Sequence, residues 1–473
     1  MDMLINGKWE SSGKSFDVIN PYNNSVVDKV PIATKDDIKR ALELSYKAKP
    51  GLSPEERADI LTSSAKELKS KRKEFSDLIT AESGLCVKQT LHGVDRSIDV
   101  LRESAKVALD IEKDITQRFV TGSPDGKPRL KVITEPLDLA VGITPFNHPL
   151  NQVAHKVCPA IAAGTCMVLK PTEKTPLAAL KFGEILLDAG LPPNMLNIIT
   201  HSPPKEAVDQ MITHPLVEMV SFTGGVDVGK YIAKTMAANG KELAKSVFEL
   251  GGNAAMTALD DADLDVAAKI GLNAFGNSGQ RCTAIKRMLV ADSIADEFIE
   301  KFMKLAEAYK YGDPMDPGMD MGTVIDEPAA IRIQDRVNKA IKEGAKLLYG
   351  NNREGALYSP TVLDNVNPRS ELVVKETFGP VAPIIRVKDI NEAIKIVNSV
   401  KYKLAGCVIT ESKDNAEKLA NETAVGQFSW NGPPGYRTEH APFGGFGDSG
   451  NYEKEGVILA AEGMRRIRTF YEH

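Results

Sequence analysis

The feature that most constrains the fold is an alternation of short apolar segments and amphipathic segments that begins near residue 139. The segments with strand character are 139–143, 166–170, 196–199 and 219–222, and those with helical period are 177–187 and 226–238. Strand–helix alternation with short connections predicts a parallel sheet covered by helices on both faces. A ligand of such a sheet binds at the carboxyl ends of its strands.

A second block of α/β character begins near residue 247. Its predicted elements are helices around 263–275 and 293–309 and strands at 382–387 and 405–409. Because a chain of 473 residues is too long for one compact core, we expect two or three domains.

The N-terminal part, before the first block, is predicted to be helical over 35–50 and 54–82. Ser53 is an N-cap residue and Pro54 suits the first helical position, so the start of the second helix is well marked.

Two segments outside these blocks have strand-like alternation. Residues 116–134 are interrupted by a turn sequence at 122–126, which predicts a β-hairpin, and residues 465–471 near the C-terminus predict one more strand.

Charge and cysteine usage exclude several classes of function. A formal net charge of −5 gives no electrostatic basis for binding nucleic acid or an anionic membrane. The five cysteines are scattered without metal-ligand spacing, which predicts reduced thiols and no metal site. The start lacks signal-peptide character, and the longest nearly apolar stretch, 159–169, is shorter than the about 20 residues that a membrane span needs. We therefore expect a cytoplasmic protein.

Cys282 lies in a glycine-flanked turn, directly after Arg281. Neighbouring cations and backbone N–H groups stabilise a thiolate, so this setting predicts a nucleophile. Upstream, Glu249 lies among apolar residues and precedes paired glycines. Burial raises the pKa of such a carboxylate toward that of a useful general base. Nucleophile and base together are what an oxidation through a thioester requires.

These segments resemble signature blocks of the aldehyde dehydrogenase superfamily, and the resemblance extends over nearly the whole chain. Seven blocks occur in the family's order: Thr144-Pro145-Phe146-Asn147, Lys170-Pro171-Thr172-Glu173, Ser221-Phe222-Thr223-Gly224-Gly225, residues 248–253, residues 275–283, Glu376-Thr377-Phe378-Gly379-Pro380 and Pro442-Phe443-Gly444-Gly445.

The resemblance implies an α/β fold with a Rossmann-type doubly wound cofactor domain, an α/β catalytic domain and a small β oligomerisation flap. The expected boundaries are 1–114 with 136–246 for cofactor binding, 247–440 for catalysis, and 115–135 with 441–473 for the oligomerisation arm and tail. The arm and tail of such proteins complete a neighbour's sheet, so we expect a homodimer or homotetramer.

The expected cofactor is NAD, with NADP less favoured. The common G-x-G-x-x-G fingerprint is missing, but Gly224 and Gly225 join a predicted strand to a helix, where phosphate binds well. By resemblance, Lys170 and Glu173 contact the adenosine ribose, and the Glu173 carboxylate repels a 2′-phosphate. The remaining cofactor residues implied by the family pattern are Thr144, Pro145, Glu376 and Phe378.

The resemblance also implies roles in catalysis. Cys282 attacks the aldehyde carbon, and the Asn147 amide with the Cys282 backbone N–H stabilises the oxyanion. Glu249 then activates the water that hydrolyses the thioester.

The substrate is expected to be an anion, and a doubly charged one. Arg281 beside the cysteine, with Arg96, His155, Thr283 and Arg437, matches positions around the substrate tunnel; guanidinium groups suit phosphonate, sulfonate and carboxylate.

Arg102 competes with Arg96 for a place at that tunnel. Six residues on one helix turn the two side chains about 120° apart, so one narrow site does not use both.

The detailed resemblance is greatest to family members that oxidise phosphonoacetaldehyde to phosphonoacetate. Alternatives are sulfoacetaldehyde, phosphonoformaldehyde, lactaldehyde or succinic semialdehyde as substrate. A different class is a CoA-acylating dehydrogenase, but such enzymes commonly lack the carboxylate base that Glu249 supplies.

Overall fold

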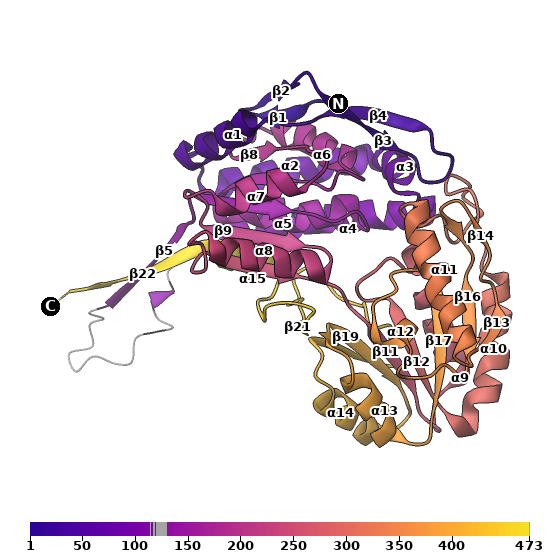
Figure 1. The fold of residues 1–473 in the computed structure, drawn as a ribbon. Helices are drawn as coiled ribbons and strands as arrows, with labels where there is room; N and C mark the ends of the chain where they lie inside the picture. Colours follow the sequence, from indigo (N-terminus) through magenta and orange to yellow (C-terminus); the bar gives the residue numbers. More distant parts are fainter. Residues whose placement is uncertain (114, 117–118, 120–129, 473) are drawn as a thin grey trace.

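The computed structural model covers residues 1–473 and describes all of them except 114, 117–118, 120–129 and 473. Two seven-stranded sheets, each carrying helices, form the two lobes of the molecule (Figure 1).

The first sheet has the strand order β10-β9-β6-β7-β8-β1-β2. Its strands are β1 (Met3–Ile5), β2 (Lys8–Glu10), β6 (Leu139–Ile143), β7 (Cys166–Lys170), β8 (Leu196–Ile198), β9 (Met219–Thr223) and β10 (Lys245–Glu249). The strands from β10 to β8 are parallel, as predicted, and β1 and β2 add an antiparallel edge.

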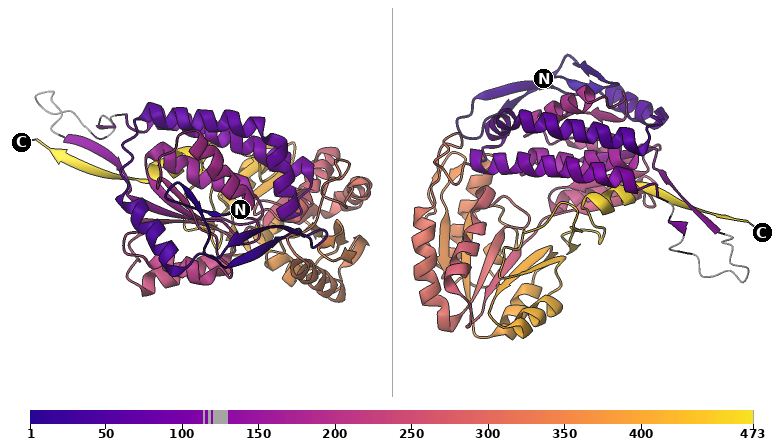
Figure 2. Two further views of the ribbon diagram at one scale, coloured as in Figure 1. Left: turned by 90° about the horizontal axis from the view of Figure 1, so that it is seen from above. Right: turned by 180° about the vertical axis from the view of Figure 1, so that it is seen from behind.

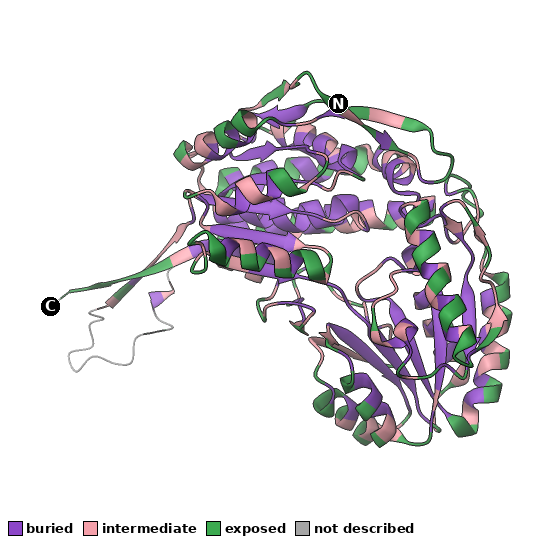
Figure 3. Cartoon of the chain, viewed as in Figure 1, coloured by how far each residue is buried: buried purple, intermediate pink, exposed green. Residues whose placement is uncertain are grey.

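Helices cover both faces of this sheet, because successive strand residues point to opposite sides. Leu139 and Val141 pack with the helices of one face, while Ala140 packs with those of the other. The central strands β6, β7 and β8 are accordingly buried, whereas the edge strand β2 is exposed (Figure 3). The helices of this lobe are α1 (Lys35–Lys47), α2 (Pro54–Ser70), α3 (Arg72–Ser83), α4 (Val87–Asp110), α5 (Pro149–Ala163), α6 (Leu177–Asp188), α7 (Lys205–Thr213) and α8 (Val226–Ala238).

The second sheet has the order β13-β16-β17-β12-β11-β19-β20 and is parallel except for β13. Its strands are β11 (Ala254–Ala258), β12 (Ile285–Ala291), β13 (Lys346–Tyr349), β16 (Thr361–Asp364), β17 (Val381–Val387), β19 (Ala405–Ile409) and β20 (Gln427–Trp430). Its helices are α9 (Leu264–Gly271), α10 (Ala295–Ala308), α11 (Glu327–Lys342), α12 (Glu371–Val374), α13 (Ile390–Asn398) and α14 (Lys413–Glu422).

In the described part of the chain, three short strand pairs are separate from these sheets and from the C-terminal strand. They are β3 (Ser15–Ile19) with β4 (Val26–Pro31), β14 (Arg353–Glu354) with β15 (Leu357–Tyr358), and β18 (Tyr402–Lys403) with β21 (Phe446–Gly447).

One predicted helix is divided in the structure. The segment 54–82 forms α2 and α3, and Lys71 between them has φ −96° and ψ 16°. No glycine or proline marks this break. It lets Phe75 and Ile79 of α3 reach the same apolar core as the buried face of α2.

The C-terminal strand β22 (Arg465–Tyr471) pairs antiparallel with β5 (Leu130–Pro136). This ribbon extends away from the first lobe in every view (Figures 1 and 2). The hairpin predicted over 116–134 contributes its last residues to β5, whereas its turn at 122–126 lies outside the described residues.

Two expected boundaries need correction. The boundary after residue 246 falls inside β10, so the first sheet continues to Glu249. Within the expected tail 441–473, helix α15 (Val457–Gly463) packs against α4 and α5, because Val457 and Ala461 belong to the apolar core of the first lobe. Only β22 of that segment forms the ribbon.

Candidate active site

The three residues predicted to carry the chemistry belong to segments that meet between the two sheets. Glu249 ends β10 in the first sheet, Asn147 precedes α5, and Cys282 precedes β12 in the second sheet. The chain between β10 and β11 passes directly against the cysteine loop, where a Cβ added to Gly252 would lie 1.9 Å from the Cys282 carbonyl oxygen. Only glycine therefore fits at this crossing.

The cysteine loop has an unusual backbone. Asn277, Ser278 and Gly279 have φ values of 58°, 54° and 68°, a left-handed run that side chains rarely adopt. Gly279 is also required because a Cβ there would lie 2.0 Å from the carbonyl oxygen of Gly379.

Hydrogen bonds hold this loop on both sides. Asn277 Nδ2 donates to the Asn147 carbonyl oxygen over 2.7 Å, and Lys286 Nζ donates to the Arg281 carbonyl oxygen over 2.6 Å. The first bond ties the nucleophile segment to the residue proposed for the oxyanion.

The Cys282 thiol is protonated at neutral pH. Burial raises its pKa to about 11, and the carboxylates of Glu376 and Glu249 add to the shift, while Lys286 and Arg437 oppose it. The sequence had placed Arg281 as a stabiliser of the thiolate. The Arg281 guanidinium, which lines a cavity, does interact with the cysteine, and further cations that oppose the shift come from β12 and from the loop after β20.

Alkylation of Cys282 in the free protein should therefore rise with pH. Below its pKa the thiolate fraction grows about tenfold per pH unit, so the rate should still be increasing between about pH 7 and 10. Mass spectrometry after iodoacetamide treatment measures this rate for each cysteine. Cys86, Cys158, Cys166 and Cys407 are buried and serve as internal controls. A rate that levels off below pH 8 would contradict the electrostatics described above.

Glu249 is buried at 3% exposure, and neither carboxylate oxygen has a hydrogen-bond partner in the described structure. Burial raises its pKa well above the usual range, and the Glu455 charge adds to the shift. Glu455 itself accepts a hydrogen bond of 2.7 Å from the fully buried Lys156. The carboxylate predicted as a general base is therefore buried, has a raised pKa and has no hydrogen-bond partner among the described residues.

The Asn147 side chain is buried, and its amide has no hydrogen-bond partner within the described residues. The same is true of the Cys282 backbone N–H. Two free donors beside a thiol are suited to stabilise a negative oxygen.

The residues predicted for the cofactor gather at the carboxyl ends of β6, β7 and β9. Thr144 donates its N–H to the Lys170 carbonyl oxygen at 3.3 Å. Lys170 is 1% exposed, burial lowers its pKa to about 8, and its Nζ lies 3.9 Å from Glu173. Pro145 follows Thr144 in the same turn.

The N-terminus of α8 faces the same region. The helix starts after Gly224 and Gly225 without a side-chain cap, so its first N–H groups are open to a ligand. The Thr223 hydroxyl just before it is buried without a partner in the described structure. These groups fit a dinucleotide, with phosphate at the helix and ribose hydroxyls at Lys170 and Glu173.

Glu376 and Phe378 belong to a segment that packs against the chain between β10 and β11. Glu376 accepts a hydrogen bond of 3.0 Å from the Gly252 N–H, and a Cβ on Gly251 would lie 2.2 Å from its other oxygen. Phe378 has φ 53° and packs edge-on against Phe146. Gly252, which Glu376 contacts, lies directly against the Cys282 carbonyl oxygen, so a single segment separates Glu376 from the cysteine.

A cavity of about 550 Å³ is lined by Arg96, Arg281 and Arg437, three of the arginines singled out in the sequence. The Arg281 side chain has no hydrogen-bond or ion-pair partner among the described residues. Arg437 packs over the Phe443 ring at 3.9 Å, and its buried Nη1 has no partner there either. Two guanidinium groups are therefore available to an anion.

Thr283 does not line this cavity but lies next to Gly435, which does. A Cβ on Gly435 would lie 2.5 Å from the Thr283 hydroxyl and 2.8 Å from Arg281 Nη2. Arg102 is not among the lining residues and pairs with Asp99 on the half-exposed side of α4, so Arg96 is the arginine of α4 at the site.

Three residues of this region were missed in the sequence. Glu439 accepts hydrogen bonds from Arg96 and contacts His155, His92 lies one helical turn before Arg96, and His148 caps α5 beside Asn147. The four-residue spacing of His92 and Arg96 indicates that the two side chains lie on the same face of one helix, so His92 could have been predicted from the sequence. Burial lowers the pKa of both His92 and His148, and nearby arginines lower it further.

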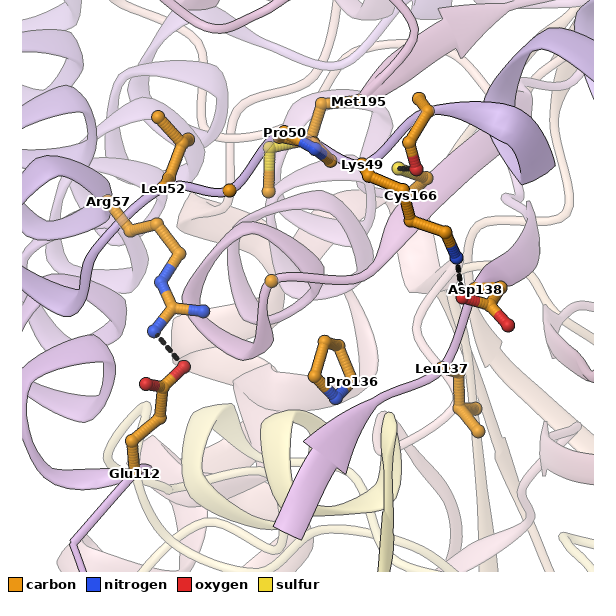
Figure 4. Close-up of a pocket in the computed structure, with 13 residues that line it drawn as sticks. Lys49, Pro50, Leu52, Arg57, Glu112, Pro136, Leu137, Asp138, Cys166 and Met195 are labelled. Atoms are coloured by element: carbon orange, nitrogen blue, oxygen red, sulfur yellow. Dashed lines mark hydrogen bonds and ion pairs between the residues drawn. The ribbon is translucent and has the colours of Figure 1, made fainter.

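A second cavity of about 270 Å³ lies near the base of the ribbon (Figure 4). Its charged side chains pair with one another: Arg57 with Glu112, and Lys49 with Asp138. It contains none of the predicted site residues. Over the described residues, no cluster of metal-ligating side chains occurs, and no helix has the length and apolar character needed to cross a membrane.

A doubly wound sheet, which suits a dinucleotide, lies beside a cysteine loop and a buried carboxylate, an arrangement suited to the chemistry of an oxidoreductase. A model of the aldehyde dehydrogenase family matches residues 9–470, and the chain belongs to this family. It is an NAD(P)-dependent enzyme that acts on an aldehyde group, as predicted.

Two curated relatives align over almost the entire chain. A 3-sulfolactaldehyde dehydrogenase of Priestia aryabhattai is 35% identical over 98% of this chain and 96% of its own length. A lactaldehyde dehydrogenase of Methanococcus maripaludis is 35% identical over the full length of both. Among solved structures, an NADP-dependent glyceraldehyde-3-phosphate dehydrogenase from Bacillus halodurans, complexed with NADP, superposes with a TM-score of 0.93 at 33% identity, over 99% and 98% of the two chains.

Proposed function

We propose that the protein oxidises a short aldehyde with an anionic group at its far end, through a thioester on Cys282. The observation that carries this proposal is the arginine-lined cavity. Arg281 has no partner in the described structure and Arg437 keeps a buried Nη1 free, although unpaired charges are costly to bury. An anionic substrate group supplies the missing partner.

Within this class, the best candidates are short 2-hydroxyaldehydes, with sulfolactaldehyde first. The relatives reported above are named for sulfolactaldehyde and lactaldehyde, and the first of these carries the sulfonate that the arginines require. Lactaldehyde is the uncharged competitor. Phosphonoacetaldehyde, favoured from the sequence, has less support because these relatives are not named for phosphonates.

NAD is the proposed cofactor, with NADP also accepted. The open N-terminus of α8 would hold the pyrophosphate, Lys170 and Glu173 the adenosine ribose, and Glu376 the nicotinamide ribose. The family's solved structures include NADP complexes, but the Glu173 carboxylate disfavours a 2′-phosphate. Bound nicotinamide supplies the hydride acceptor for the oxidation.

In the first half-reaction, Cys282 loses its proton and its sulfur attacks the aldehyde carbon. The Asn147 amide and the Cys282 N–H, which have no other partners in the described structure, donate to the oxygen that becomes negative. Arg281 and Arg437 hold the far end of the substrate, which fixes the carbonyl relative to the sulfur.

In the second half-reaction, Glu249 accepts a proton from the water that hydrolyses the thioester. Burial raises the pKa of Glu249, so its ionised form is a stronger base than an exposed carboxylate. Because a buried base is present, we propose that water rather than CoA releases the acyl group.

The ribbon of β5 and β22 is the proposed contact between subunits. Ile467, Phe470 and Tyr471 of β22 are exposed apolar side chains on a two-stranded ribbon, which is marginally stable alone. Pairing with another copy would cover them in a homodimer or homotetramer. We also propose that the two lobes act as a cofactor domain and a catalytic domain, with β10 assigned to the first.

Substitution of Arg281 by Ala tests the proposed substrate class. We expect kcat/KM for sulfolactaldehyde to fall about 30- to 160-fold, the result of losing ~2–3 kcal/mol at one of two buried charged contacts. For lactaldehyde the loss should be less than about threefold, because no charge is left unpaired. Steady-state NADH formation with both aldehydes measures the ratio.

Arg102→Ala is the matched control, since Arg102 is an exposed arginine of α4 that does not line the cavity. It should leave both substrates unaffected. Equal losses for the two aldehydes in Arg281→Ala would show that Arg281 serves the loop or the thiol and not an anion.

A further inference from the structure

A carboxylate lies within the anion-binding cavity itself. Glu439 is 9% exposed, and its Oε1 and Oε2 accept hydrogen bonds from Arg96 Nε at 2.6 Å and Arg96 Nη2 at 3.0 Å. This is the two-pronged geometry that a guanidinium forms with a carboxylate. Arg96 therefore presents neither an unpaired charge nor these two N–H groups to a substrate.

The same carboxylate fixes His155 on α5. His155 Nε2 lies 2.6 Å from Glu439 Oε2, and burial, with the charge of Arg437, lowers the pKa of the ring. A neutral ring that close to a carboxylate must carry its proton on Nε2. Arg437 Nη2, 3.2 Å from the same nitrogen, thus finds no lone pair there and stays available to a ligand.

The charges around the cavity can then be counted. Arg96, Arg281 and Arg437 are positive and Glu439 is negative, while the other two carboxylates that line the cavity, Asp99 and Glu103, pair with Arg102 and Lys106. The net positive charge facing a ligand is that of two arginines, not three. A doubly charged tail therefore meets one positive charge fewer than three free arginines would offer.

We infer that Glu439 is a positioning residue that biases the cavity toward singly charged tails, such as a sulfonate or carboxylate, and against doubly charged phosphonates. It does so through Arg96, whose charge it cancels, and by placing its own charge next to the anion. This inference rests on the proposed function and adds to it the charge of the preferred substrate.

The test compares sulfoacetaldehyde with phosphonoacetaldehyde, two aldehydes of equal length that differ by one charge at about pH 8, above the second ionisation of phosphate-like groups. In Glu439→Gln, the ratio of kcat/KM for phosphonate over sulfonate should rise about tenfold, the size expected for one added unit charge a few ångströms away. The change should occur mainly in KM.

A charge-matched series separates this effect from a structural one. Arg96→Gln should shift the ratio in the opposite direction, and the double variant Arg96→Gln/Glu439→Gln, which removes both charges, should return it to within about twofold of the original. Asp99→Asn removes an exposed carboxylate of the same cavity, whose charge is screened by solvent and paired with Arg102, and should change the ratio by less than about twofold. Thermal unfolding and cofactor binding verify that each variant is folded.

The outcomes are distinct. If the unaltered protein prefers propionaldehyde to both anionic aldehydes, the proposed function fails. If it prefers the anions but the ratio is the same in Glu439→Gln and in the double variant, the proposed function stands and the role of Glu439 is wrong. If Glu439→Gln does not fold, an unchanged ratio in Arg96→Gln overturns the inference in the same way.

Discussion

Substitution of Cys282 by Ala should abolish aldehyde oxidation, with kcat reduced by about 10⁴- to 10⁶-fold, because no other group in the site can form the thioester. The other cysteines are buried in the lobes away from this loop. Cofactor binding should be retained, since the proposed contacts come from Lys170, Glu173 and the N-terminus of α8. NADH production and cofactor titration by fluorescence measure the two properties separately.

Cys166→Ala is the appropriate control, because Cys166 lines the second cavity at the base of the ribbon and not the active site. It should retain full activity. Turnover above about 1% of the original in Cys282→Ala would remove Cys282 as the nucleophile, since loss of a covalent catalyst costs far more than this.

Substitution of Glu249 by Gln should produce a burst of NADH equal to the enzyme concentration, followed by slow turnover. Steady-state kcat should fall about 10²- to 10⁴-fold, the range for loss of a general base. The burst is expected because acylation uses Cys282 and Asn147, whereas hydrolysis needs the base. Gln preserves the side-chain shape, and the carboxylate it replaces has no hydrogen-bond partner within the described residues.

Stopped-flow absorbance resolves the two phases, and the exposed neighbour of this region, Glu453, provides a control variant, Glu453→Gln. Loss of the burst together with turnover would mean that Glu249 also deprotonates Cys282, which the high pKa of that thiol would then explain. Formation of acyl-CoA when CoA is added would instead favour the CoA-acylating class.

Much of the fold was predictable because its determinants are local. The run of buried strands and the glycines at strand ends predicted β6, β7, β9 and α8 to within a residue, and the apolar setting of Glu249 predicted its burial and raised pKa. The break at Lys71 was not predictable, because no helix-breaking residue marks it and the two helices share one core. The predicted boundary after residue 246 was misplaced because it depends on the pairing of β10 with β9, which are separated along the chain.

The charge of the substrate cavity shows most clearly what could not be predicted from the sequence. The sequence predicted that the arginines meet, and Arg96, Arg281 and Arg437 line one cavity, but it could not show which of them is paired with a carboxylate. Whether a guanidinium is free depends on which carboxylate reaches it, and Glu439 is 343 positions from Arg96 along the chain. The three arginines therefore suggested a larger excess of positive charge than the assembled cavity carries.

The sequence by itself determined the family and the parallel sheet, and it supplied the candidates for the nucleophile and the base, because each depends on residue type and on neighbours close in the chain. The tertiary structure alone decided the ionisation of Cys282, the exclusion of Arg102, the tautomer of His155 and the cancellation of Arg96 by Glu439. These properties depend on desolvation and on the distances between charges from separate elements, and neither exists until the chain has folded.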